Sequence, residues 1–273
     1  MAGVEQLEVK LRAAMAHRTE PATIVAVAVW LRKLHKSTGK LSWDKKDILK
    51  FLDNLVESDA KPNTVRTAFA AIKMIHTYLD MSWPDIRPRE LPRQLPQKVH
   101  RPYLTLDEVK EMVDWVKSDG DPVERALLSM SSVYGLRRVE LSRLDRKSFD
   151  YPKVFIATAK HGLPREHLIA DPIWPYIEPA IRYLPIQSVT SLSFLYNRMC
   201  DRMGKARQEA EGWHSIRRTL ASELVMAGFS ELEIAHFMRW SAGRNSMVSL
   251  YSQSLRLDDS RIFAKHSILE FWK

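Results

Sequence analysis

The chain has 273 residues, enough for two domains, and its 45% hydrophobic and 27% charged residues are typical of a folded protein rather than a disordered one. Its single cysteine, Cys200, excludes an intrachain disulfide and a cysteine-based zinc cluster, and its nine histidines show no metal-ligand spacing. The longest apolar run, Ile24–Leu31, is less than half of the roughly 20 residues that a membrane span needs. We therefore expect a soluble, cytoplasmic protein with no metal site and no membrane partner.

The formal net charge is +9 at pH 7, which favours a polyanionic partner such as nucleic acid or an acidic membrane surface. Basic residues that only keep the protein soluble are an equally good explanation of the charge alone. The choice between these explanations therefore depends on motifs.

Residues 1–83 are predicted to form an N-terminal domain of about four helices without strands. Thr19 is the predicted cap of a helix that starts with Glu20 and Pro21, and Ser42 is the predicted cap of the next helix. A third helix is predicted to start near Pro62, and a short amphipathic one precedes Ala16. Apolar residues follow helical spacing through the three longer segments, at Ile24, Val27, Leu31 and Leu34, at Ile48, Phe51, Leu52 and Leu55, and at Val65, Phe69, Ile72, Ile75 and Leu79.

Residues 84–102 contain five of the fourteen prolines, so neither a helix nor a paired strand can continue through them. The segment is also basic, with Arg87, Arg89, Arg93, Lys98 and Arg101 against two acidic residues. An extended basic strap can follow the phosphate backbone of a duplex, whereas a solvated linker is the alternative. We favour DNA contact by these five side chains, given the motifs described below.

Residues 103–273 are predicted to form a second, mainly helical domain with a small β-hairpin. The predicted helices cover residues 105–117, 122–134 and about 137–145, the first capped by Thr105, and helical periodicity returns from about residue 173. Between them, Val154–Thr158 is a strand signal, followed by a turn with Gly162 and a second short strand at about 167–170. The expected fold class is therefore mainly α in both domains.

Two pairs of residues in this domain are spaced to act together. Arg137 and Glu140, in the segment GLRRVEL, lie three apart on one helix face, so the carboxylate can hold the guanidinium in place. An ordinary surface ion pair is the alternative. His214 and Arg217 have the same spacing and could grip one anion together, or could belong to a solvated basic face.

Three further residues gain meaning only from their order along the chain. Lys160 lies in the hairpin turn, where a lysine is usually only a surface residue. Trp240 precedes Tyr251, which is the only one of eight tyrosines after His214. Taken singly, each of these residues is unremarkable.

In this order, Arg137, Lys160, the His214–Arg217 pair, Trp240 and Tyr251 resemble the pattern of the tyrosine recombinase (phage integrase) family. The segment GWHSIRRTLASELVMAGFSELEIAHFMRWSAGRNSMVSLYSQ is similar to the C-terminal signature of that family almost throughout. The resemblance covers residues 104–255 by motif and the N-terminal helices by architecture, in a two-domain layout like that of Xer and Cre.

The sequence departs from the family pattern at three places. Trp240 stands where most members have His, although its indole N–H can still donate to a phosphate oxygen. Arg218 stands where bacterial members usually have His, and the turn around Lys160 lacks the customary second lysine.

The resemblance implies a DNA core-binding domain at residues 1–83, a catalytic domain at 103–273, and DNA strand cleavage through a 3′-phosphotyrosyl intermediate. Tyr251 would be the nucleophile, and His214 would assist removal of its proton. Arg137 and Arg217, with His214 and Trp240, would donate to the phosphate oxygens, while Lys160 would protonate the leaving 5′ oxygen. Glu140 would support Arg137, and Arg138 is a further candidate DNA contact. No cofactor or metal is expected.

A type IB topoisomerase is the nearest alternative enzyme, and a DNA-binding relative that has lost activity is the alternative of a different class. The last residues, 260–273, are rich in large apolar side chains that need burial. They either pack on their own domain or, as the resemblance implies, dock on a neighbouring copy in a homotetramer on double-stranded DNA.

Overall fold

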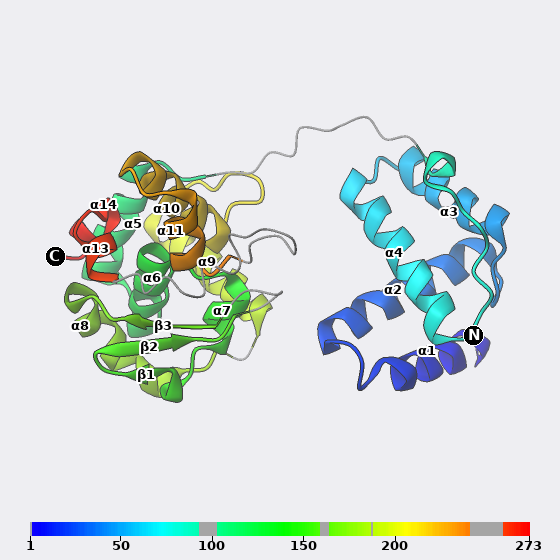
Figure 1. Cartoon of the computed structure of the whole chain (residues 1–273), viewed down its shortest axis with the longest axis horizontal. Coiled ribbons are helices and arrows are strands. Elements are labelled where there is room, and N and C mark those ends of the chain that lie inside the picture. The colour runs from blue at the N-terminus through cyan, green and yellow to red at the C-terminus, as the bar shows by residue number, and fades with distance from the viewer. Residues whose placement is uncertain (1, 93–102, 159–163, 187, 241–258) are drawn as a thin grey trace. The chain divides into compact units, whose positions relative to one another are not determined.

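The computed structural model describes residues 2–92, 103–158, 164–186, 188–240 and 259–273. Contacts within the chain divide it into two compact units, residues 1–99 and residues 100–273. Both units are mainly helical, and the second also contains a small antiparallel sheet (Figure 1). The expected fold class is therefore confirmed.

In its described residues, 2–92, the N-terminal unit has four α-helices around an apolar core. They are α1 (Ala2–Met15), α2 (Pro21–Thr38), α3 (Lys45–Glu57) and α4 (Pro62–Tyr78), followed by the 3-10 turn η1 (Pro88–Glu90). Helix α2 packs against the other three helices, and the apolar stripes predicted from the sequence meet in the core. Leu31, Leu34, Ile48, Leu52 and Ile72 are fully buried there.

Both predicted helix caps in this unit are wrong. Helix α2 is preceded by Glu20, whose side chain makes no capping bond, and Thr19 instead lies with its hydroxyl 3.2 Å from that of Tyr78. Helix α3 is capped by Asp44 rather than by Ser42, because the Asp44 carboxylate reaches the backbone N–H of Asp47 while the Asp47 side chain accepts from Asp44.

The second unit is organised around helix α6 (Pro122–Tyr134), whose side chains are buried at most positions. Figure 1 shows this helix among its neighbours, and it packs against α5, α8, α10 and α14. The other helices are α5 (Leu106–Asp119), α7 (Arg138–Arg143), α8 (Trp174–Ile177), α9 (Val189–Met203), α10 (Trp213–Met226), α11 (Glu231–Phe237), α13 (Asp259–Phe263) and α14 (Ser267–Glu270), with 3-10 turns η2 (Arg146–Ser148), η3 (Asp171–Ile173) and η4 (Glu178–Tyr183). The predicted cap of α5 is confirmed, since Thr105 forms a capping box with Glu108.

The sheet has the order β1-β2-β3, with both pairs antiparallel. Its strands are β1 (Phe149–Asp150), β2 (Lys153–Ile156) and β3 (Arg165–Leu168), and the register places Val154 opposite His167. The second strand was predicted two residues too late. Ala170 lies outside the ladder because its N–H donates to the hydroxyl of Tyr134.

The C-terminal helices α13 and α14 pack on their own unit. Ile262, Ile268, Leu269 and Trp272 are between 0% and 4% exposed, and the Trp272 indole N–H donates to Ser132 Oγ at 3.1 Å. For these four side chains the structure therefore shows burial within the same chain, the first of the two alternatives that the sequence left open.

Candidate active site

The candidate site is centred on Glu140, which lies in the first turn of α7 and is 1% exposed. Its carboxylate accepts the backbone N–H of Arg137, the residue that precedes the helix, at 2.8 Å, and Arg137 Nη1 at 2.6 Å. The ion pair predicted from the spacing is therefore present, but it is not a surface pair. A buried carboxylate that fixes both the backbone and the side chain of Arg137 leaves that guanidinium little freedom.

Two more arginines, from distant parts of the chain, share this carboxylate. Arg239 Nη2 lies 3.3 Å from Glu140 Oε2, and Arg217 Nη1 lies 3.9 Å from it. The three guanidinium groups carry three positive charges and the carboxylate one negative charge, so the cluster has a net charge of +2. Of the three arginines, Arg137 has the most accessible side chain, with 22% exposed, so it forms the outer edge of the cluster.

Arg217 is held by backbone carbonyls as well as by charge. Its guanidinium donates to the carbonyl oxygen of Gly135 and, at 2.7 Å, to that of Met238. Gly135 ends α6 with φ +59°, and a Cβ atom there would lie 2.6 Å from the Met238 side chain. The left-handed conformation favours glycine here, and a larger residue would also have to displace the end of the Met238 side chain.

The pKa values show that the cluster keeps its charges. Burial alone would raise the pKa of Glu140, but the guanidinium of Arg239 and the groups of Arg137 outweigh it, and the pKa is lowered. Burial, then the like charges of Arg137 and Arg239, lower the pKa of Arg217 to about 9. At pH 7 Glu140 is ionised and Arg217 is protonated.

His214 lies one turn before Arg217 on α10, and its side chain reaches the surface. The partial burial of its ring, then the charges of Arg217 and Arg138, lower its pKa to about 4. Its imidazole is therefore neutral at pH 7 in the DNA-free protein. A neutral imidazole beside a cationic cluster can accept a proton.

Trp240 completes the set of predicted residues that the structure brings together. Its side chain is 36% exposed, and its ring centre lies 5.8 Å from the central guanidinium carbon of Arg217. This distance is within the range of a cation–π contact. Arg137 and Arg217 thus lie at the Glu140 carboxylate, with Trp240 against Arg217 and His214 one turn before it, and the four residues come from three separate segments.

Other predicted residues lie elsewhere or are not described. Arg138 Nη1 donates to Ser193 Oγ on α9 at 2.6 Å. Arg87 and Arg89 are exposed in the N-terminal unit, where Arg87 Nε lies 3.6 Å from Asp85. The predicted residues that fall outside the described part of the chain are Lys160 and Tyr251, and Arg93, Lys98 and Arg101 of the linker.

Sequence reasoning missed Arg239, His167 and Asp259, which continue the cluster into the core. Arg239 Nη1 lies 3.0 Å from His167 Nε2, and His167 Nδ1 lies 3.2 Å from Asp259 Oδ2. No local spacing could have revealed them, because these residues meet only in the folded chain.

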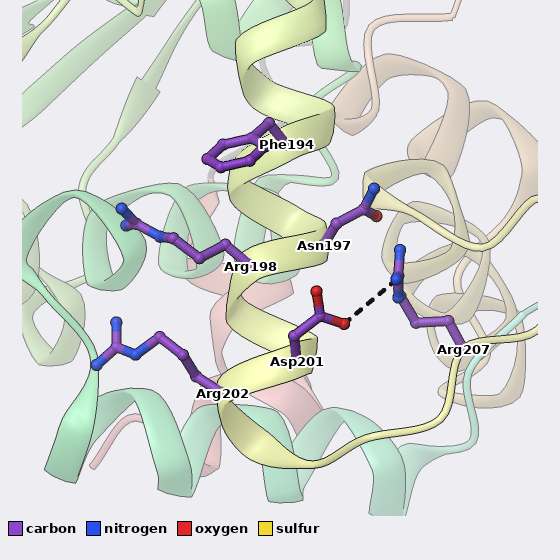
Figure 2. Close-up of a pocket in the computed structure, with 6 residues that line it drawn as sticks. All are labelled: Phe194, Asn197, Arg198, Asp201, Arg202 and Arg207. Carbon is purple, nitrogen blue, oxygen red and sulfur yellow. Dashed lines mark hydrogen bonds and ion pairs between the residues drawn. The ribbon is translucent and has the colours of Figure 1, made fainter.

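A second group of arginines lines a hollow on the outer face of α9 (Figure 2). Its lining residues are Phe194, Asn197, Arg198, Asp201, Arg202 and Arg207. The arginines are neutralised there, since Arg207 pairs with Asp201 and the other two pair with Asp121 and Glu124. The hollow contains none of the residues predicted from the sequence, and it lacks the charge surplus of the Glu140 cluster.

The described residues lack two further features. None of the helices described is long and apolar enough to cross a membrane. Within the same part of the chain, no group of three or more His, Cys, Asp or Glu side chains could hold a metal ion.

Comparison with solved structures shows that this chain has the fold of the tyrosine recombinases. Lambda integrase bound to DNA aligns with a TM-score of 0.65 at 14% sequence identity, over 90% of this chain and 95% of that one. The Tn1549 transposon integrase in complex with a circular intermediate DNA gives 0.64 at 14% identity, over 96% and 98%. A lambda integrase tetramer bound to a Holliday junction gives 0.63 at 14% identity, over 90% and 78%.

No protein-family model and no curated protein matches the chain. The resemblance found in the sequence is thus confirmed for the fold. At 14% identity the likeness shows the fold and does not assign roles to individual side chains.

Proposed function

We propose that this chain is a site-specific DNA recombinase that cleaves and rejoins DNA strands through a 3′-phosphotyrosyl intermediate. The observation that carries the proposal is the cluster of Arg137 and Arg217 on buried Glu140, with His214 and Trp240 beside Arg217, in a chain that shares its fold with integrases solved on DNA. These four residues are among the six that the sequence motifs single out.

The charge of the cluster suits an attack on a phosphodiester. The phosphate carries one negative charge, and a second develops on its non-bridging oxygens as phosphorus becomes five-coordinate. The surplus of two positive charges around Glu140 matches that final state, so the cluster stabilises the transition state more than the bound substrate. A guanidinium has five N–H donors in a plane, which suits Arg137 and Arg217 to paired phosphate oxygens.

In the proposed reaction the phenol oxygen of Tyr251 forms a bond to phosphorus, and the bond from phosphorus to the 5′ oxygen breaks. The phenol has an ordinary pKa near 10, so its proton needs an acceptor, and the neutral imidazole of His214 is our candidate. Lys160 would give a proton to the leaving 5′ oxygen. One phosphodiester replaces another, so rejoining is the same step in reverse and needs no nucleotide.

Binding of double-stranded DNA is part of the proposal, with residues 1–83 as core-binding domain, residues 84–102 as a basic strap, and Arg138 as a further contact. Assembly as a homotetramer on DNA is proposed as well, in line with the lambda integrase tetramer on a Holliday junction. Four apolar side chains of residues 260–273 are already buried within their own unit, so they give no evidence of docking between copies. The mass of the protein–DNA complex in solution therefore tests the tetramer.

The proposal is tested by covalent trapping on a singly nicked duplex that carries DNA flanking the gene. The intact chain should form an adduct that survives denaturing electrophoresis, and Tyr251→Phe should form none while it still binds the duplex. An adduct in Tyr251→Phe would refute the assigned nucleophile. Relaxation of supercoiled plasmid without site preference would favour a type IB topoisomerase, and DNA binding without any adduct would favour an inactive relative.

A further inference from the structure

Arg239 stands out because its backbone and its side chain are both costly to place. Its φ is +56°, in the left-handed region that residues other than glycine rarely adopt, and its side chain is fully buried. Glycine at this position would avoid the backbone strain, and an apolar residue would avoid the burial of a charge. The contacts of its guanidinium therefore have to explain why an arginine stands here.

Those contacts join two sides of the core. On one side Nη2 donates to the carbonyl oxygen of Tyr134 at 2.9 Å and lies 3.3 Å from Glu140 Oε2. On the other side Nη1 donates to the carbonyl oxygen of Phe237 at 3.0 Å and lies 3.0 Å from His167 Nε2. A planar group with several donors is needed to reach all four acceptors at once, and lysine could not do so.

The contact with His167 fixes the tautomer of that ring. A guanidinium only donates, so His167 Nε2 must be the acceptor, and the ring proton must be on Nδ1, 3.2 Å from Asp259 Oδ2. The Asp259 carboxylate also accepts Arg165 Nη2 at 2.8 Å and the backbone N–H of Leu168 at 2.9 Å.

Glu140, Arg239, His167 and Asp259 therefore form one continuous buried line, in which each residue is at most 3% exposed. The line begins at the carboxylate that holds Arg137 and includes residues of β3, α7 and α13. It also ties together residues 239 and 259, of which the first lies one residue before the last described position, 240, and the second is the next described position.

Stability alone does not explain such a line. A buried ion pair stabilises a fold weakly or not at all relative to apolar residues of the same size, because desolvation offsets the attraction. What the buried line does provide is a fixed direction for the Glu140 carboxylate. Its Oε1 accepts from the Arg137 guanidinium, and its Oε2 faces the guanidinium groups of Arg217 and Arg239 and accepts the backbone N–H of Arg137.

We propose that Arg239 is a positioning residue for DNA strand cleavage, an inference that rests on the proposed function. It holds Glu140 from the core side, and through Glu140 it orients Arg137 and Arg217 toward the scissile phosphate. His167 and Asp259 in turn hold Arg239. With its guanidinium buried, Arg239 acts on the reaction without touching DNA.

The test compares single-turnover cleavage of the nicked duplex by the full chain and by Arg239→Met and Arg239→Lys. Misplacing a catalytic group by about 1 Å can cost about a hundredfold in rate, so we expect a loss of about that size in Arg239→Met. Arg239→Lys keeps the charge but reaches fewer acceptors, and we expect it to recover only part of the rate. The DNA dissociation constant should stay within about twofold of the wild-type value, because the guanidinium is buried away from the surface.

Arg202→Met, on α9 (Figure 2), is the matched control. Arg202 Nη1 also pairs with a buried glutamate, Glu124 of α6, at 2.8 Å. It should cleave at the wild-type rate. A purely structural loss would lower the fraction of active protein, and hence the amplitude, without changing the rate constant of the active molecules.

The outcomes separate the inference from the proposed function. A wild-type chain that forms no adduct would refute the function and the inference with it. A wild-type chain that cleaves, beside an Arg239→Met variant of unchanged rate constant, would refute the inference alone. If Arg239→Met does not fold, Arg239→Lys decides the question, and a wild-type rate in that variant would overturn the positioning role.

Discussion

The two units of the chain bury different kinds of side chain. Among the described residues, the N-terminal unit has an apolar core whose only buried polar side chain is that of His76. The second unit buries a set of charged or titratable groups beneath the candidate site: Glu140, Arg217, Arg239, His167 and Asp259. One core follows from hydrophobic burial alone, whereas the other includes groups whose burial is unfavourable unless each is paired.

The second unit also shows that burial of one charge is not enough to mark a site. Glu124 is 1% exposed, but its partners Arg198 and Arg202 have 38% and 42% of their side chains exposed. Around Glu140 the partners are less exposed, from 22% of the side chain for Arg137 to 0% for Arg239. An arginine at the surface can break its ion pair at little cost in free energy, whereas a buried arginine is held in place. A positive charge that is already held in place stabilises a transition state best.

The sharpest test of this difference is Arg217→Met. Removal of an arginine from a phosphoryl-transfer site costs about 10⁴-fold in rate, or about 5 kcal/mol of barrier. We expect covalent adduct formation to fall by that factor in a single-turnover assay.

Arg261→Met is the control for Arg217→Met, because Arg261 pairs with Glu233 at the surface with 66% of its side chain exposed. It should cleave at the wild-type rate. A loss of less than about tenfold in Arg217→Met would remove Arg217 from the proposed mechanism.

Acid should weaken the second unit more than the first. Burial lowers the pKa of His167 and of His266 from 6.5 to about 4, so the folded state resists protonation of both rings. The stability they contribute is complete above pH 6.5 and is lost as the pH falls from 6.5 to 4. At pH 5, which is about 1.5 units below the ordinary pKa of 6.5, the loss of unfolding free energy is about 2 kcal/mol for each ring, or about 4 kcal/mol for both.

Hydrogen exchange at pH 7 and pH 5, corrected for the intrinsic rate, measures this loss separately in peptides from each unit. His266→Gln is the informative variant, because its amide can still donate to the carbonyl of Val133, which His266 Nε2 contacts at 2.9 Å, yet cannot titrate. This variant should remove about half of the loss of stability that His167 and His266 cause together. Equal acid sensitivity in the two units would contradict the contrast between their cores.

Leu52→Ala probes the apolar core in the same way. Leu52 is fully buried in the N-terminal unit, and truncation of such a side chain costs about 3 kcal/mol. We expect faster exchange throughout α2, α3 and α4, with no change in α6 of the second unit. Leu49→Ala, at a partly buried position of the same helix, should cost less. An equal effect on α6 would show that the two units unfold together.

Sequence patterns predicted those features that depend on neighbours along the chain. Helical periodicity predicted the helices up to α7 one by one and the rest of the second unit only as helical from about residue 173. The spacing of Arg137 and Glu140 predicted their ion pair. The burial of that pair was missed, because it depends on Arg217 and Arg239, which lie 77 and 99 residues from Glu140. The position of β3 was missed for a similar reason, since the hydroxyl of Tyr134 takes the N–H of Ala170.

Helix caps mark the limit of local reasoning most clearly, and they give the smallest of the expected effects. Ser42 and Asp44 are both acceptable capping residues, and the sequence alone favoured the wrong one. In the structure the Asp44 carboxylate accepts the N–H of Asp47 at 2.9 Å, and the Asp47 carboxylate accepts the N–H of Asp44 at 3.2 Å.

Asp44→Ala should therefore lower the unfolding free energy of the N-terminal unit by about 1 kcal/mol, while Ser42→Ala should change it by much less. Asp44→Asn should retain most of the stability, because its amide oxygen can still accept from Asp47. Hydrogen exchange of the backbone amides of α3 measures the unfolding free energy of all three variants. A larger loss in Ser42→Ala than in Asp44→Ala would restore the cap that the sequence suggested, and would move the start of α3 toward the N-terminus.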